Sequence, residues 1–279
     1  MTDHTSDAED PRKSSMKRFR TTELSNSRFE SGNLRFITVK TPNLKGRGNI
    51  CVFVPEGIRT DDLPIVVLLH GVYGSCWCWS MLGGAHHTAG RMIGEDRIPP
   101  AILAMPSDGL WGDGSGYLPH DGFSFDRWIV DDVVDAVRLN IPQAKSSTKT
   151  YIAGLSMGGF GALRLGARFP ESFLGIAAHS SITRLSEMKL FVAEDLGAYR
   201  QTNPEEEDVF DLIRKTGDRL PRLRFDCGTD DELIEGNRLL HRQLTEAGIV
   251  HRYEEFPGGH AWTYWEEHLE DSLLFLLGE

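Results

Sequence analysis

Short, continuous apolar runs separated by stretches of helical periodicity are the feature that most constrains the fold of this chain. A strand covered by helices on both faces reads as such a run, because neither face meets water. The first two runs are joined by the turn-like stretch "KTPNLKGRG", which predicts an antiparallel pair. The expected strands are Leu34–Val39, Asn49–Val54, Pro64–Leu69, Ala101–Met105, Thr150–Gly154, Phe173–Ala178, Leu223–Cys227 and His251–Phe256.

Helical periodicity fills most of the intervals between these runs. Gly248 follows the fourth helical stretch directly and is a typical stop signal at a helix C-terminus. The expected helices are His86–Ile93, Phe125–Leu139, Met157–Phe169, Glu232–Ala247 and Tyr264–Leu277. Repeated alternation of strand and helix predicts an α/β fold, with a mostly parallel sheet of about eight strands and helices on both faces.

The chain is expected to form one folded domain. Residues 1–28 are polar and predict a poorly ordered N-terminal arm, and residues 29–279 hold all of the periodic segments. Residues 180–221 carry many charges and only short amphipathic pieces such as Val209–Ile213, so we expect a small insertion there. Such a segment offers no broad apolar face for a long acyl chain or a lipid interface.

Charge and cysteine content restrict the classes of partner. The formal net charge of -11 argues against nucleic-acid binding. No apolar run approaches the roughly 18 residues of a membrane helix, so we expect no membrane partner. The N-terminal segment lacks an apolar core, which predicts a cytoplasmic protein. Cys51, Cys76, Cys78 and Cys227 lack zinc-site spacing, so no metal is expected and they are interpreted as free thiols.

One stretch, "YIAGLSMGGFGALRLGARF", suggests catalysis. Gly154 to Gly158 fit G-x-S-x-G, with a strand before the motif and a helix after it, as a nucleophile elbow requires. Small neighbours allow Ser156 to adopt an unfavourable backbone conformation and expose its hydroxyl above the sheet edge. A phosphate-binding loop is the rival interpretation, but neither G-K-[ST] nor G-x-G-x-x-G follows. Ser156 is therefore the candidate nucleophile.

A serine nucleophile needs a base and an orienting carboxylate. His260 lies in a glycine-containing loop after the last expected strand, at the sheet edge where it can meet Ser156. "RLRFDCGTDDELIEG" offers three aspartates, of which Asp226 lies within the strand and below the rim. One of Asp230 and Asp231 is expected to cap the helix that follows. The order Ser156, Asp231, His260 is that of the Ser–Asp–His hydrolases with this elbow.

The loop after the third strand completes a possible catalytic set. It reads His70-Gly71-Val72 and continues with Tyr73 and Gly74. The backbone N–H of Val72 and that of Met157, next to Ser156, could together donate to a carbonyl oxygen as an oxyanion hole. A simple glycine-assisted loop is the alternative.

These motifs together resemble one known family. "LLHGVYGS", "AMPSDG", "GLSMGGFGAL", "CGTDDEL" and "FPGGHAWTYW" look like the putative-esterase branch of the α/β-hydrolases, over about residues 34–277. That branch includes feruloyl and acetylxylan esterases, S-formylglutathione hydrolase and mycobacterial mycolyltransferases. The resemblance implies that Asp231, the last residue of G-T-x-D, is the triad acid. It also implies that Val72 and Met157 supply the oxyanion donors.

Aromatic residues are the candidates for substrate contact. Trp111 and Tyr117 lie in the glycine-rich loop "SDGLWGDGSGYLPHDG" and, with Tyr73, are expected to line the pocket. Trp262 and Trp265 are expected to pack the last helix instead. Asp108, Asp113 and Asp121 in the same glycine-rich loop lack calcium-binding spacing and are interpreted as solvated turn residues.

The predicted function is hydrolysis of short-acyl carboxylic esters through an acyl-enzyme, with a small-molecule ester as the partner and no cofactor. Two alternatives remain open. An acyltransferase would use the same residues with an alcohol in place of water, and a non-catalytic binding protein could use the same fold. The sequence does not indicate an oligomeric state.

Overall fold

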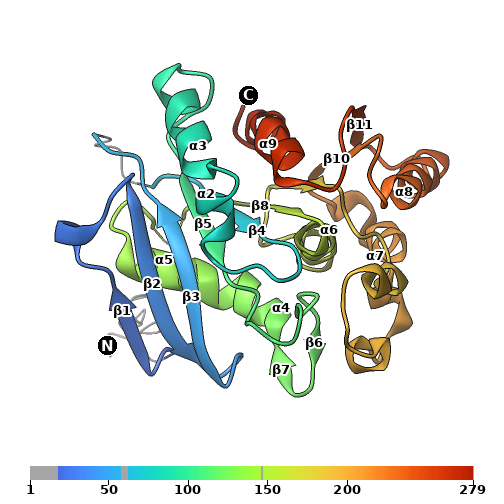
Figure 1. The fold of residues 1–279 in the computed structure, drawn as a ribbon, viewed down its shortest axis with the longest axis horizontal. Coiled ribbons are helices and arrows are strands. Elements are labelled where there is room, and N and C mark those ends of the chain that lie inside the picture. The colour runs from blue at the N-terminus through green and yellow to red at the C-terminus, as the bar shows by residue number, and fades with distance from the viewer. Residues whose placement is uncertain (1–17, 58–61, 146, 279) are drawn as a thin grey trace, which may run out of the picture.

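The computed structural model describes residues 18–57, 62–145 and 147–278. Its nine-stranded sheet has the order β1-β2-β3-β5-β4-β8-β9-β10-β11 and spans the molecule (Figure 1). The strands are β1 (Thr21–Leu24), β2 (Leu34–Thr41), β3 (Gly46–Phe53), β4 (Ile65–Leu69), β5 (Ile102–Pro106), β8 (Thr150–Leu155), β9 (Gly175–His179), β10 (Arg222–Gly228) and β11 (Arg252–Phe256). A separate two-stranded pair consists of β6 (Pro119–His120) and β7 (Phe123–Ser124).

The direction of the strands confirms the expected fold class. β5, β4, β8, β9, β10 and β11 pair in parallel, whereas β1, β2 and β3 run antiparallel to their neighbours. All eight expected strands are present, within a few residues of their expected limits. In a parallel sheet the loops after the strands share one rim, so the loops that follow β4, β8, β10 and β11 can meet.

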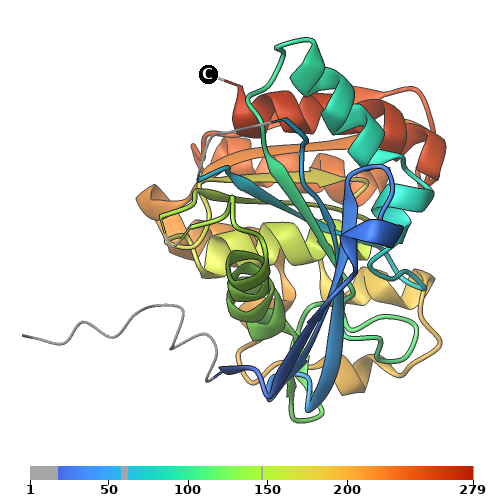
Figure 2. The same cartoon turned by 90° about the vertical axis from the view of Figure 1, so that its left-hand side faces the viewer.

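Helices cover both faces of the sheet (Figure 2). They are α2 (Cys78–Met81), α3 (Ala85–Gly94), α4 (Phe125–Arg127), α5 (Val134–Asn140), α6 (Met157–Arg168), α7 (Val209–Thr216), α8 (Ile234–Glu246) and α9 (Trp262–Leu277). The short 3₁₀-helices are η1 (Ser27–Phe29), η3 (Leu185–Leu190), η4 (Leu196–Tyr199), η5 (Pro204–Glu207) and η6 (Gly217–Arg219), and the π-helical segment η2 (Trp128–Val133) joins α4 to α5.

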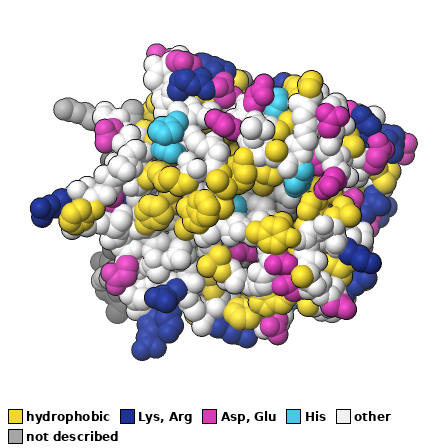
Figure 3. Space-filling view, in the orientation of Figure 1, with side chains coloured by type: hydrophobic (Ala, Val, Ile, Leu, Met, Phe, Trp, Pro, Cys, Tyr) yellow, Lys and Arg dark blue, Asp and Glu magenta, His cyan; other side chains and the backbone are white. Residues whose placement is uncertain are grey.

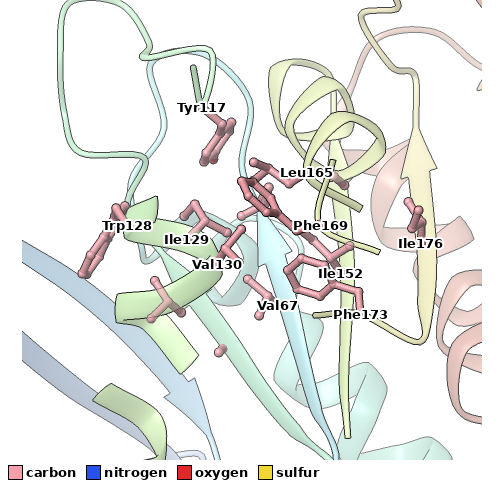
Figure 4. Close-up of a cluster of buried hydrophobic side chains, with 14 of the residues drawn as sticks. Val67, Tyr117, Trp128, Ile129, Val130, Ile152, Leu165, Phe169, Phe173 and Ile176 are labelled. Carbon is pink, nitrogen blue, oxygen red and sulfur yellow. The ribbon is translucent and has the colours of Figure 1, made fainter. Parts of the chain in front are cut away.

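Alternation along the strands divides the core into two layers. Ile65, Val67 and Leu69 of β4 pack with α5 and α6, while Val66 and Leu68 pack with α3 and α9. Figure 4 shows part of the first layer, where side chains from the sheet meet those of η2 and α6. Both faces of β4 are therefore shielded from water, which explains the uninterrupted apolar run in its sequence.

Two of the expected segments differ from their prediction. Of the arm expected over residues 1–28, residues 1–17 lie outside the described ranges, but Thr21–Leu24 forms the edge strand β1 by pairing with β2. The helix expected at Phe125–Leu139 includes the π-helical segment η2, within which Asp132 is buried and accepts a hydrogen bond from Asn43. Contacts with distant segments produce both features, and local sequence patterns do not encode such contacts.

Candidate active site

Ser156 lies at the turn between β8 and α6, with the backbone angles φ 54° and ψ −121°. This conformation is unfavourable for a residue with a side chain and persists only where the surroundings enforce it. Two glycines make the turn possible. A Cβ on Gly154 would lie 2.1 Å from the Gly158 carbonyl oxygen, and one on Gly158 would lie 2.3 Å from that of Leu69. The motif glycines therefore allow close backbone contact around the serine.

The loop after β10 brings Asp231, and the loop after β11 brings His260, close to Ser156. His260 Nε2 is 2.9 Å from Ser156 Oγ, and His260 Nδ1 is 3.0 Å from Asp231 Oδ2. The loops are joined to each other, because the Asp230 N–H donates to the Gly258 carbonyl over 2.8 Å. Hydrogen bonds thus connect the three side chains in series, the arrangement in which a histidine can accept a proton from a serine.

The environment keeps Asp231 charged. Its side chain is buried, and burial alone would raise the pKa of its carboxyl. The hydrogen bond and charge attraction of His260, together with the Leu233 N–H, outweigh burial and lower that pKa below its ordinary value. Because Asp231 also accepts the Leu233 N–H, it caps the turn that leads into α8. The same residue is therefore placed for both roles considered for this aspartate pair, while Asp230 is exposed.

The loop after β4 lies directly against the serine. A Cβ on Gly71 would be 3.2 Å from Ser156 Cβ and 3.6 Å from Oγ. Val72 follows Gly71, and Met157 is the first residue of α6, where N–H groups have no intrahelical partner. Within the described ranges, neither the Val72 N–H nor the Met157 N–H has a hydrogen-bond partner. Both are therefore available as donors beside Ser156.

A pocket of about 370 Å³ opens at the serine. Its walls include Ser156, His260 and a set of apolar side chains, namely Tyr73, Trp77, Leu82, Phe191, Trp262 and Trp265. Phe191 stacks on the His260 ring with centroids 5.1 Å apart, and Trp265 meets the same ring edge-on at 5.0 Å. Hydrophobic side chains also gather across the middle of the face seen in Figure 1, as the space-filling view shows (Figure 3). The imidazole is thus enclosed by aromatic rings.

The expected aromatic contacts need correction. Tyr73 lines the pocket, but Tyr117 is fully buried and donates its hydroxyl hydrogen to the His70 carbonyl. Trp111 packs against His120 and Tyr199, away from the residues that line the pocket. A glycine-rich loop after a strand indicates proximity to the rim, but it does not tell which aromatic ring turns inward.

Residues expected to serve only packing also reach the pocket. Trp262 and Trp265 begin the last helix as expected, and both line the pocket as well. Their position directly after His260 was the available signal. Phe191 lies in the insertion, where no sequence pattern indicates a role in the site. Its backbone carbonyl accepts a hydrogen bond from the Tyr73 hydroxyl, which ties the insertion to the loop after β4.

One of the three loop aspartates is not solvated as expected. Asp108 is 2 % exposed, and its carboxylate accepts the N–H groups of Leu110 and Ser115 over 2.9 and 2.6 Å. The Asp113 carboxylate accepts the Ala193 N–H, while Asp121 is exposed. Asp108 and Asp113 therefore brace the loops around the pocket.

Thiols and metal ligands are a second possible source of chemistry. All four cysteines are free and buried, and burial raises the pKa of Cys78, which lines the pocket. This thiol therefore remains protonated and is a poor nucleophile. In the parts of the chain that the structure describes, no three His, Cys, Asp or Glu side chains are grouped to hold a metal ion. None of the helices in those parts combines the length and hydropathy that crossing a membrane requires.

A mostly parallel sheet covered on both faces, with a serine at the strand-to-helix turn, defines an α/β-hydrolase. The model of the family described as "Putative esterase" matches residues 41–276, and the chain belongs to this family of esterases. Because the chain belongs to this family, it is a serine esterase rather than a non-catalytic binding protein with the same fold.

Curated relatives and solved structures agree with this assignment. The chain is 28% identical over 235 residues to an acetyl esterase of Caldicellulosiruptor saccharolyticus, covering 78% of this chain and 84% of the relative. It is 26% identical over 252 residues to the esterase Rv1288 of Mycobacterium tuberculosis, covering 76% of this chain and 52% of that protein.

Two solved structures show the same fold. A ferulic acid esterase superposes with a TM-score of 0.74 at 21% identity, covering 93% of this chain and 98% of its own. The S-formylglutathione hydrolase of Staphylococcus aureus superposes with a TM-score of 0.73 at 19% identity, covering 91% and 99%. At such identities the likeness establishes the fold alone.

Proposed function

We propose that this esterase hydrolyses short-acyl carboxylic esters through an acyl-enzyme formed on Ser156. The observation that carries the proposal is the hydrogen-bonded series Ser156–His260–Asp231, with distances of 2.9 and 3.0 Å, at the pocket floor. Ser156 loses its proton to His260 Nε2 as Oγ attacks the ester carbonyl carbon. Asp231 accepts the Nδ1–H of His260, which holds the ring in orientation and stabilises its positive charge.

Two backbone donors stabilise the tetrahedral intermediate. The carbonyl oxygen becomes an oxyanion and accepts the N–H groups of Val72 and Met157. The N-terminus of α6 adds a positive potential beside the same oxygen. His260 then protonates the leaving alkoxide, and water attacks the acyl-enzyme by the reverse sequence of proton transfers, which releases the carboxylic acid and restores Ser156.

Pocket size and lining support an uncharged, small acyl group. The volume of about 370 Å³ is near the lower end of the range of about 300–1,000 Å³ for ligand pockets. The ionisable side chains that line it are those of His70, His260, Tyr73 and Cys78, and the lining holds no carboxylate, lysine or arginine that could pair with a charged acyl group. The free, buried cysteines fit a reducing compartment, so we place the enzyme in the cytoplasm.

The nucleophile is tested by Ser156→Ala with p-nitrophenyl acetate as substrate. We expect a fall in turnover on the order of 10⁶-fold with no change in thermal unfolding. Ser181→Ala is the matched control, because the hydroxyl of this buried serine donates to the Ile182 carbonyl. Mass spectrometry of the wild-type protein after fluorophosphonate treatment should place the adduct on Ser156. Retention of a tenth of the wild-type turnover by Ser156→Ala would contradict the assignment.

Acyl transfer is the second candidate, because apolar side chains are exposed at the pocket mouth. Tyr73 is 71% exposed and Leu82 46% exposed, a surface that an apolar alcohol can contact. The alcohol would take the place of water in attacking the same acyl-enzyme. Product analysis with added alcohols separates the two activities: ester formation that exceeds hydrolysis at millimolar alcohol would favour the transferase.

A further inference from the structure

His70, the residue after β4, has both ring nitrogens engaged by the backbone. It is 1% exposed, its Nε2 lies 3.1 Å from the Asp108 amide nitrogen, and its Nδ1 lies 2.6 Å from the Gly71 carbonyl oxygen. A backbone N–H can only donate and a carbonyl can only accept. A neutral ring therefore satisfies both contacts in one tautomer alone, with the proton on Nδ1 and a bare Nε2.

The Gly71 carbonyl belongs to the same peptide group as the Val72 N–H. The described chain contains no cis peptide bond, and in a trans peptide the C=O and N–H point in opposite directions within one plane. A hydrogen bond that holds the carbonyl therefore also holds the direction of the N–H. It further polarises the amide, which strengthens the N–H as a donor.

We propose that His70 is a positioning residue for the oxyanion hole: its Nδ1–H fixes the Gly71–Val72 peptide so that the Val72 N–H is presented at Ser156. The inference rests on the proposed function, because it gives the Val72 N–H its role. His70 itself touches neither Ser156 nor His260 through any hydrogen bond within the described ranges.

The surroundings of the ring make it a firm support. A Cβ on Gly74 would lie 2.4 Å from His70 Nδ1, so the loop folds closely over the ring. Asp108, which donates its N–H to the ring, is itself held in place because its carboxylate accepts the N–H groups of Leu110 and Ser115. The Asp108 N–H thus holds the imidazole at Nε2, and the imidazole holds the Gly71–Val72 peptide through Nδ1.

Loss of this support should affect turnover rather than substrate binding. The negative oxygen exists only in the transition state and the tetrahedral intermediate, so its donors lower the barrier without strengthening ground-state binding. Complete removal of one oxyanion donor costs about 10²–10³-fold in kcat. A donor that remains present but is no longer oriented should cost less, about 10- to 100-fold in kcat with little change in KM.

His70→Asn and His70→Gln form a matched pair that separates the two ring nitrogens. The side-chain nitrogen of asparagine is as many bonds from Cα as Nδ1, and that of glutamine is as many as Nε2. We expect His70→Asn to retain the hydrogen bond to Gly71 and most of the wild-type kcat for p-nitrophenyl acetate. His70→Gln should lose about 10- to 100-fold in kcat.

An inhibitor and a control variant distinguish orientation of the donor from general loop damage. A trifluoromethyl ketone forms a tetrahedral oxyanion on serine, so its Ki should rise in His70→Gln in parallel with the loss of kcat. Tyr117→Phe removes a hydrogen bond to the preceding carbonyl, that of His70, and should leave both constants within about threefold. Equal kcat and Ki values for the asparagine and glutamine variants overturn the inference.

The wild-type protein offers a test that no folding defect can disturb. In ¹⁵N-histidine-labelled enzyme, the nitrogen shifts of His70 should report a protonated Nδ1 and a bare Nε2. A proton on Nε2 overturns the inference, whatever the variants do. The proposed function is tested separately by Ser156→Ala, so an inactive Ser156 variant together with the wrong His70 tautomer would reject only the inference.

Discussion

At the scale of single residues, the candidate site shows how one side chain can have two tasks. Asp231 accepts the Nδ1–H of His260 and also caps the turn that leads into α8. The turn places the carboxylate, and the carboxylate stabilises the turn, so the geometry of the acid is set by local structure rather than by a flexible loop.

Substitution of the two adjacent aspartates tests this assignment. Asp231→Asn should lower kcat by roughly 10⁴-fold, because an amide can donate to His260 Nδ1 and so select the wrong tautomer. Asp230→Asn should change kcat by less than about threefold, since this side chain is exposed. Steady-state kinetics with p-nitrophenyl acetate measure both variants, and similar mild losses in the two would direct the search for the acid elsewhere.

The sequence points to those candidate residues that have a strong local signature, and the structure brings them together. Ser156 is marked by the glycines of its turn, and His260 by its position after the last strand. The prediction that Tyr117 lines the pocket is wrong. The direction of its side chain depends on a hydrogen bond to the His70 carbonyl, which is a contact between segments far apart in the chain. Phe191 carries no local signal, because its position over His260 arises from packing of the insertion.

At the scale of secondary-structure elements, a buried polar network joins the three segments that carry Ser156, Asp231 and His260. Asp226 of β10 lies 2.9 Å from His179 of β9 and accepts the Tyr264 hydroxyl of α9 over 2.9 Å. The His179 carbonyl in turn accepts the Ser156 N–H over 2.9 Å.

Arg224 completes the network by an ion pair with Asp226, and both side chains are fully buried. The network therefore links two sheet strands and the last helix directly beneath the site.

Removal of the Asp226 charge should destabilise the fold strongly. Asp226→Asn leaves the buried Arg224 without its nearest counter-charge, and breaking such a pair typically costs about 3–5 kcal/mol in the free energy of unfolding. Urea unfolding measures this change. Glu235→Gln is the control, because it breaks an exposed ion pair with Arg238 and should cost no more than about 1 kcal/mol. Similar small losses in both variants would show that the buried network contributes little.

The same residue predicts a pH dependence of stability. Burial alone would raise the pKa of Asp226, but charge attraction and hydrogen bonding from His179, with Arg224 and Tyr264, lower it. Its folded-state pKa therefore lies below the unfolded value of about 3.9. The contribution to stability is complete above that value and is lost as pH falls through the folded pKa. Between pH 3 and 5, the free energy of unfolding should fall more steeply in the wild type than in Asp226→Asn. Parallel curves would refute this linkage.

The elements themselves were largely predictable because strand and helix periods are local properties. All eight expected strands occur, but β1 and the π-helical turn η2 do not follow from local pattern. β1 is polar and exists through backbone pairing with β2, while η2 surrounds the buried Asp132, which bonds to Thr41 in β2. Both depend on partners distant in sequence.

At the scale of the whole molecule, the insertion covers one side of the pocket without enclosing it. It consists of α7 and several short 3₁₀-helices, and it meets the pocket through Phe191. The Tyr73 hydroxyl and the Asp113 carboxylate bond to its backbone, so the cover is tied to the loops around the site rather than hinged as an apolar lid. Such an arrangement favours substrates that fit a fixed pocket.

Substrate size should follow from this architecture. We expect the highest kcat/KM for p-nitrophenyl acetate and butyrate, with at least a tenfold decline by chains of about ten carbons, because the pocket of about 370 Å³ lies at the small end for ligand sites. The rate should not jump as the substrate passes its micelle threshold, since the described residues of the insertion form no broad apolar lid that could open. A rate optimum at palmitate, or interfacial activation, would contradict the prediction.

The outer strand β11 has a consequence for contacts between copies of the protein. An edge strand presents unpaired backbone groups that can extend a sheet into a neighbouring molecule. β11 reads Arg-Tyr-Glu-Glu-Phe from Arg252 to Phe256, and ion pairs join Arg252 to Glu254 and Arg238 to Glu255. A second copy that docked along this strand would have to strip water from these charges. We therefore expect these charges to disfavour end-to-end growth of the sheet at its β11 edge.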